Sequence, residues 1–297
     1  MRDKGAATYR VRPEWGHRAV IAQLTGAIVR AFLVVLLIAT PSLLLPDVSS
    51  DATQIVALVA LFAAGLTFFE YSAKYPGLVE FRDAPPFNRI RFGSMLVTVF
   101  LLTMIYLGQS SPTPLTQFVR AVGALVGVII DFPYSPVSLV LLMLPPDASL
   151  QDVQLVRMAA GMAYLISLLS LAVFILLIQV NHWPSRNGAF NVWINLPTFD
   201  PTAGGDVVDR LARDARFNVA LGFILPFVVP AVAKAATIAF GPVTLHNSQT
   251  MIWVISAWAL LPSSLFMRGI AIGRIGRMIR EQRRRATPAE EAEFVPA

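Results

Sequence analysis

Residues 158–180 read MAAGMAYLISLLSLAVFILLIQV, a run of 23 residues without one charged side chain. A helix needs about 20 mostly apolar residues to cross the hydrocarbon core of a bilayer. Inside that core the backbone N–H and C=O groups must bond within their own segment, which favours an α-helix. The stretch therefore predicts a membrane-spanning helix over about 157–180.

The rest of the chain has the same character. Of its 297 residues, 56% are hydrophobic and only 14% are charged, whereas soluble domains carry about 25% charged residues. We expect an all-α polytopic transmembrane bundle that forms a single integral membrane domain over 1–297. Its six predicted spans cover about 24–45, 53–72, 92–109, 157–180, 218–240 and 250–270. We expect the first run to be a retained span and not a cleaved signal peptide, because further spans follow it.

The basic residues indicate an orientation. The N-terminus, the 70–92 loop, the 181–217 loop and the C-terminal tail together hold 21 of the 24 lysines and arginines. Cytoplasmic segments of membrane proteins carry such an excess, so both termini are expected in the cytoplasm. Only three of the 24 are lysine, a bias common in GC-rich bacterial genomes. The predicted location is therefore a bacterial inner membrane.

The segment 115–146 does not fit a simple hairpin. LTQFVRAVGALVGVII (115–130) has a helical pattern, and SPVSLVLLMLPP (135–146) is apolar but only about half a span long. The pair forms either an interfacial helix with a short plug on the outer surface or a re-entrant hairpin. The interfacial alternative is favoured, because Arg120 and Asp131 would both be costly inside lipid.

Two features of this segment bear on its packing. Arg120 and Asp131 are 11 residues apart, close to three helical turns, so they share a face. We expect that face to meet water or lipid headgroups. Gly123 and Gly127 form a GxxxG motif that allows another helix to approach closely.

A charged loop, EFRDAPPFNRIRFG (80–93), joins the second and third spans. Its acids and bases suit ion-pair docking of a partner protein, and they equally suit pairing with one another in a stiff loop that sets the angle between two spans. Both interpretations stay open. The docking candidates are Glu80, Arg82, Asp83, Arg89 and Arg91.

Two further cytoplasmic segments look amphipathic. DVVDRLARDAR (206–216) predicts a short helix at the membrane surface. MRGIAIGRIGRMIREQRRR (267–285) predicts a basic helix beside the membrane, where each arginine contributes about 1 kcal/mol of attraction to anionic lipid. The acidic end of the tail, 287–297, is expected to be disordered. The lipid-headgroup candidates are Arg274, Arg277, Arg280, Arg283, Arg284 and Arg285.

The sequence gives little support to enzyme chemistry. It has no cysteine and only three histidines, and it contains no GxGxxG, GxxxxGK[ST], HExxH or GxSxG motif. We predict no catalytic residue, no metal and no cofactor. The basic pI near 10.1 is attributed to lipid contact and topology, so nucleic acid is not an expected partner.

Three functions remain. The first is a non-enzymatic accessory, assembly or scaffolding protein that binds membrane lipids, anionic at the cytoplasmic face, and a larger membrane protein complex. The alternative is a small-solute transporter or channel, because Pro226 and Pro230 interrupt a span that also holds Lys234. The third is an enzyme that acts on lipid at the inner interface through the Glu80–Asp83 region.

Overall fold

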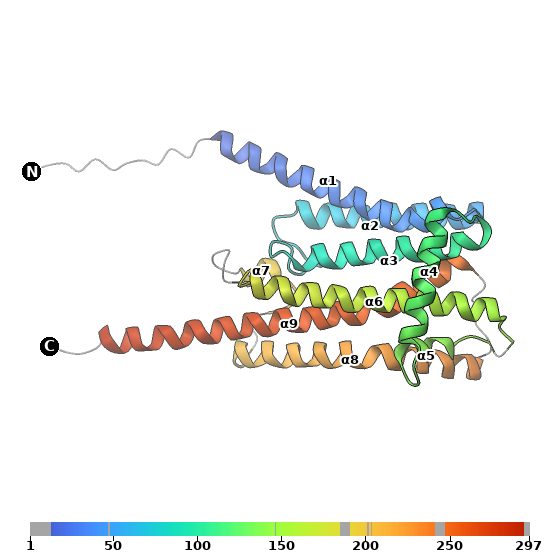
Figure 1. Ribbon diagram of the computed structural model, residues 1–297. Coiled ribbons are helices and arrows are strands. Elements are labelled where there is room, and N and C mark those ends of the chain that lie inside the picture. The colour runs from blue at the N-terminus through green and yellow to red at the C-terminus, as the bar shows by residue number, and fades with distance from the viewer. Residues whose placement is uncertain are drawn as a thin grey trace, which may run out of the picture.

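The structure is a computed structural model that describes residues 13–46, 48–145, 147–184, 191–200, 202, 204–240 and 247–293. These residues form helices and no strand (Figure 1). The helices are α1 (Pro13–Leu44), α2 (Ser50–Ser72), α3 (Phe87–Ser110), α4 (Pro114–Ile130), α5 (Pro136–Leu141), α6 (Leu150–Val180), α7 (Val192–Asn195), α8 (Val207–Phe240) and α9 (Ser248–Glu293).

Six of these helices are long and apolar enough to cross a membrane: α1, α2, α3, α6, α8 and α9. The six predicted spans are therefore confirmed, and the chain is a multi-pass membrane protein. Helix α1 begins and α9 ends at the same end of the bundle (Figure 1). We call this the terminal end, and we call the opposite end, where α4 and α5 lie, the far end.

Hydroxyl side chains fix where several helices begin near the far end. Ser49, Ser135 and Ser149 each accept a hydrogen bond from the backbone N–H three residues later, which starts α2, α5 and α6. Thr113 and Thr116 form a reciprocal capping box at the start of α4. Caps of this kind satisfy backbone donors that a helix leaves without a partner.

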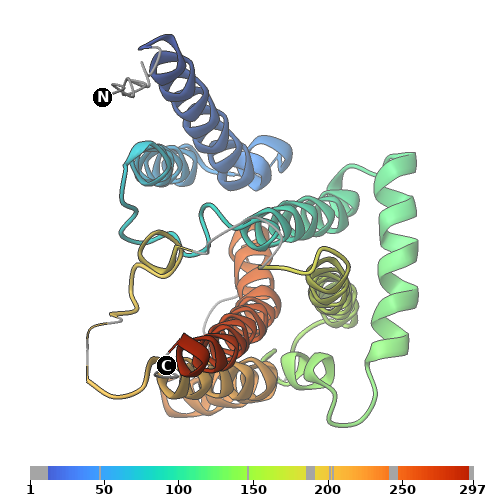
Figure 2. The same cartoon turned by 90° about the vertical axis from the view of Figure 1, so that its left-hand side faces the viewer.

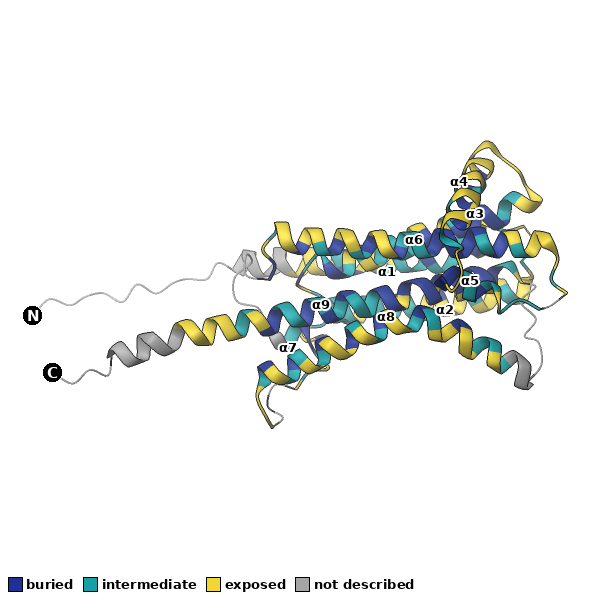
Figure 3. Ribbon diagram, turned by 60° about the horizontal axis from the view of Figure 1, so that its bottom comes forward, coloured by how far each residue is buried: buried dark blue, intermediate teal, exposed yellow. Residues whose placement is uncertain are grey.

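Helices α3, α6 and α9 form the buried centre of the bundle (Figure 3). One hydrophobic cluster, around Leu102, Ala159 and Ile255, fills the far half. A second cluster fills the terminal half around Phe81, Phe174 and Ile272. The α1–α2 pair stands to one side of this centre (Figure 2). Helix α2 packs mainly against α1, through Ala60 and Ala64.

Two helices are longer than the sequence predicts. The expected surface helix 206–216 is not separate, because its residues form the first turns of α8 without a break into the span. Helix α9 runs for 46 residues from the far end past the terminal end of the bundle (Figure 1). It includes 287–293, so the expectation of disorder there is wrong, and 294–297 lie outside the described residues.

Helix α4 lies crosswise to the spans, near the far end (Figures 1 and 2). This orientation agrees with the interfacial alternative, because a re-entrant hairpin would run along the bundle axis; the depth of α4 in the membrane stays a prediction. The contact with the bundle is very close: a Cβ on Gly161 of α6 would lie 2.7 Å from the Cα of Gly127, and a Cβ on Gly127 would lie 2.9 Å from the carbonyl oxygen of Arg157. The second glycine of the GxxxG motif is thus the crossing point of α4 and α6.

The expected exposure of the charged face of α4 is wrong. Asp131, at the end of α4, accepts a 2.8 Å hydrogen bond from Nε of Arg157 on α6, and the stem of Arg120 lies against Gly108 of α3. The face turned away from the bundle is apolar instead, with Phe118 and Leu125 about two-thirds exposed. Lipid accepts the apolar face of a membrane helix as readily as a protein core does, whereas Asp131 needs a partner and finds it in Arg157.

Candidate functional site

The loop after α2 is built on the carboxylate of Glu70. Its oxygens accept the backbone N–H groups of Gly77, Leu78 and Val79, with donor–acceptor distances of 3.1, 2.9 and 3.1 Å. Three N–H groups on one charged acceptor form strong, charge-assisted bonds. The loop is therefore anchored to the last turn of the helix that precedes it.

Arg82 closes the end of α2 from the other side. Its Nη1 donates to the carbonyl oxygens of Glu70, at 2.9 Å, and of Ala73, at 2.6 Å. Its Nε donates to Asp83 at 3.1 Å, and only 6% of the Arg82 side chain is exposed. The last carbonyls of a helix need donors from outside the helix, and a buried arginine supplies them here.

Phe81 fixes the path of the next residues. It has a φ of +53°, which is uncommon for a bulky residue, and its ring is buried 4.5 Å from the ring centroid of Phe87 and 6.0 Å from that of Trp183. Its N–H donates to the carbonyl of Asn195, the last residue of α7, at 2.7 Å. With the Phe81 ring in the core, Glu80 is turned toward α8 and α9.

Glu80 meets Arg268 of α9 there. The guanidinium holds the carboxylate with two bonds, of 2.7 Å from Nε and 2.9 Å from Nη2. Its Nη1 also donates to Asp214 of α8 at 3.1 Å. Thr198 donates to Glu80 at 2.9 Å, and Asn218 donates to Asp214 at 2.7 Å. We call Glu80, Asp214 and Arg268 the arginine clasp.

The clasp joins three segments at the terminal end: the 73–86 loop, α8 and α9. Its side chains are 13% exposed for Glu80, 23% for Arg268 and 31% for Asp214. Arg268 and Asp214 are not among the residues that the sequence singled out. The sequence did offer one signal. Arg268 directly follows an apolar span, and Glu80 and Asp214 lie close to span ends on the same arginine-rich side of the predicted topology.

The loop candidates fall into two groups. Arg82 pairs with Asp83 of the same loop, whereas Glu80 pairs with Arg268 of α9, a partner that neither interpretation of the loop names. Asp83 is 54% exposed although it pairs with Arg82, and Arg89 and Arg91 are exposed on the first turns of α3. Of the five candidates these last three are exposed, and the guanidinium of Arg91 also lies over the Phe87 ring, 5.1 Å from its centroid.

The tail candidates also divide. Arg274 donates to the carbonyl oxygens of Ile178 and Trp183, so it closes the end of α6 and is only partly exposed. Arg283 bonds Asp206, just before α8, at 2.5 Å. This hydrogen bond holds the pKa of Asp206 below its usual range. The remaining candidates are exposed on α9: Arg277, Arg280, Arg284 and Arg285.

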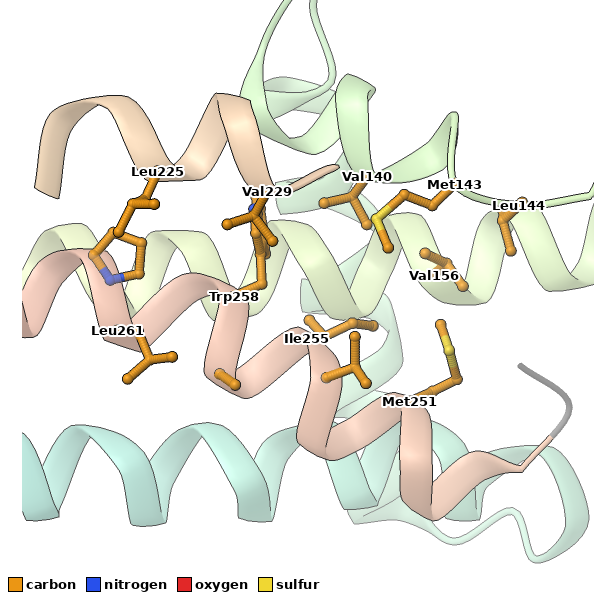
Figure 4. A pocket seen from close by; sticks show the side chains of 13 residues that line it. Val140, Met143, Leu144, Val156, Leu225, Val229, Met251, Ile255, Trp258 and Leu261 are labelled. Atoms are coloured by element: carbon orange, nitrogen blue, oxygen red, sulfur yellow. The ribbon is translucent and has the colours of Figure 1, made fainter. Parts of the chain in front are cut away.

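The residues of the alternative pathway surround an apolar space. Pro226 and Pro230 are buried in α8, and Lys234 is partly buried. A cavity of about 440 Å³ lies beside them, between α5, α6, α8 and α9 (Figure 4). Its walls are hydrocarbon, thioether and aromatic side chains, so it offers almost no polar atom to a hydrophilic solute.

No protein-family model, curated protein or solved structure matches this chain. In the described part of the chain, no three histidine, aspartate or glutamate side chains gather where they could hold a metal ion. The fold and the contacts at the terminal end are therefore the basis for assigning a function.

Proposed function

We propose that this protein is a non-enzymatic scaffolding or assembly subunit of a bacterial inner membrane, with both termini in the cytoplasm. In this proposal its cytoplasmic loop surface binds a neighbouring protein of a larger membrane complex. The observation that carries the proposal is that Asp83, Arg89 and Arg91 are exposed on a loop whose frame is held by Arg82 and the arginine clasp.

A rigid frame favours this role on physical grounds. Binding costs less when the side chains that meet a partner are already held in place. The loop backbone is fixed at Glu70, Arg82 and Phe81, so a partner meets preformed charges of both signs. Complementary charges at such a surface give specificity and faster association.

The competing functions find less support. The carboxylate of Glu80 is occupied by Arg268 and Thr198, which leaves it a structural anion rather than an acid or base aimed at lipid. The apolar walls of the cavity beside Pro226 do not suit a route for a hydrophilic solute.

Affinity purification of the tagged full chain from its native membrane in mild detergent, with quantitative mass spectrometry, tests the proposal. The variant combines Asp83→Ala with Arg89→Ala. Arg82 is left intact because it closes α2. We expect the partner protein to be depleted at least tenfold, which is about 1.4 kcal/mol of binding free energy.

The matched control combines Asp51→Ala with Asp147→Ala, which removes two exposed charges at the far end. We expect it to retain the partner. Recovery of the same proteins with wild type, variant and control would refute the role of the loop in docking.

A further inference from the structure

The cavity exists because α8 and α9 separate halfway along their contact. In the terminal half, their backbones touch: a Cβ on Gly269 would lie 2.7 Å from the carbonyl oxygen of Ala215, and one on Gly222 would lie 2.8 Å from that of Pro262. Pro262 also lines the bottom of the cavity. Beyond it, toward the far end, larger side chains separate the two helices.

Two prolines shape the wall at this point. Pro230 has no N–H, so the carbonyl of Pro226, four residues earlier, has no donor within its own helix. Nε1 of Trp258 on α9 donates to that carbonyl at 3.0 Å instead. The only polar atom of the Trp258 ring is thereby satisfied, and the ring lines the cavity (Figure 4).

Neither water nor the protein fills this space. Water in a cavity needs two to four polar partners, and these walls supply almost none. An empty space of this size would deprive the lining atoms of dispersion contacts. About 440 Å³ lies within the range of about 300–1,000 Å³ of cavities that hold small ligands.

The rim of the cavity faces outward. Val229 and Val254 are 39% and 38% exposed, and Leu261 is 61% exposed. All three belong to membrane-spanning helices, so at this depth their surroundings are hydrocarbon chains. A chain can therefore enter sideways without crossing a polar layer.

We infer that this cavity is a binding site for one fatty acyl chain of a membrane phospholipid. The chain lies between α8 and α9 against Trp258, with Met251 and Ile255 beneath it and Val140 above (Figure 4). Its headgroup remains outside, at the membrane surface of the far end. The site differs from the arginine-rich tail in position and in chemistry, and it does not depend on the scaffolding function.

Photolabelling in vesicles tests this site. The full chain is reconstituted with phosphatidylethanolamine and phosphatidylglycerol that include a phospholipid with a diazirine on one acyl chain, and labelled peptides are quantified. Met251 and Ile255 are only 5% and 1% exposed, whereas Leu58 and Phe62 on α2 are 70% and 68% exposed. We expect labelling of the two buried residues to equal or exceed that of the two exposed ones, and to saturate at a low fraction of labelled lipid.

Two variants obstruct the cavity from different sides: Val156→Phe from α6 and Val229→Trp at the rim. We expect each variant that remains folded and monodisperse to lose label at Met251 and Ile255 by at least tenfold, with label at Leu58 and Phe62 unchanged. Two results would overturn the inference. One is α2 labelling in the wild type without label in the cavity, and the other is cavity label that persists in both obstructed variants.

Discussion

Arg268 shows how one side chain sets the arrangement of three segments. It lies 188 residues from Glu80 and 54 residues from Asp214, and it bonds both. The loop alone predicts that its acids and bases either pair with one another or dock a partner protein; Arg82 does pair with Asp83, but Glu80 pairs with Arg268 outside the loop. The partner of Glu80 was not predictable, because the choice depends on how α8 and α9 pack and not on any local pattern.

The first prediction concerns this clasp. Arg268→Ala removes the hydrogen-bonded counter-charge of two carboxylates, Glu80 and Asp214, and we expect it to destabilise the folded protein by about 2–4 kcal/mol. Arg268→Lys keeps the charge but loses the two-pronged bond to Glu80, so its loss should be smaller. Denaturant unfolding in detergent micelles measures both. Arg277→Ala, at an exposed position of the same helix, is the control. Equal stabilities of Arg268→Ala and the control would show that the clasp contributes nothing.

A second prediction concerns the pH response of Asp206. Its pKa is lowered in the folded protein, chiefly by the hydrogen bond from Arg283. The contact therefore contributes fully above the pKa of the unfolded chain, and its contribution is lost as pH falls through the lower folded value. Carboxyl NMR of labelled aspartate should show this pKa move back toward its usual range in Arg283→Ala. An Asp206 titration that is the same in wild type and variant would contradict the contact.

At the scale of elements, hydropathy alone was sufficient to locate the six spans, because length and the absence of charge decide whether a helix can cross a bilayer. It could not orient α4. In a soluble protein the apolar face of an amphipathic helix marks the core, but around a membrane protein lipid competes equally well for that face. The orientation of α4 depends on Gly127, which permits close contact with α6, and on Asp131, which pairs with Arg157 of α6.

The crossing of α4 over α6 gives the third prediction. Gly161→Val would place side-chain atoms inside the backbone of α4 at Gly127, so we expect it to displace α4 and to destabilise the protein by about 1–3 kcal/mol. Thermal unfolding in detergent provides the measurement. Gly65→Ala in α2 meets nothing within 4 Å, so it should be neutral or slightly stabilising. If Gly161→Val unfolds like Gly65→Ala, the close crossing is not present in solution.

The carbonyl of Pro226 in α8 gives the fourth prediction. Trp258→Phe removes the only donor identified for the carbonyl of Pro226, and a buried carbonyl left without a partner costs about 1–3 kcal/mol. Pro230→Ala restores an N–H in the helix that can serve the same carbonyl. We therefore expect Trp258→Phe to cost less in the Pro230→Ala background, a coupling that a double-mutant cycle of unfolding free energies measures. Additive effects of the two substitutions would refute this account of the Pro226 carbonyl.

At the scale of the molecule, α1 begins and α9 ends at the same end of the bundle (Figure 1). The fifth prediction assigns that end to the cytoplasm. The natural chain has no cysteine, so single cysteines report without background. We expect Gln151→Cys, at the far end, to react with a membrane-impermeant maleimide in intact cells. Glu290→Cys should react only after the membrane is opened. The reverse pattern would show that the predicted membrane orientation is wrong.

Because α9 is one uninterrupted helix, its length fixes how far its last residues lie from its first. A helix of 46 residues is about 69 Å long, whereas a bilayer core is about 30 Å thick. Among the residues 248–285 whose side chains are described, burial in α9 ends at Gly276, and the following turns carry exposed arginines, of which Arg283 still bonds Asp206. Because the helix is continuous, the distance of Arg284 from the bundle and its direction around the helix axis follow from the number of residues between them. Each residue inserted after Gly276 would lift Arg284 by about 1.5 Å and swing it round the axis by about 100°.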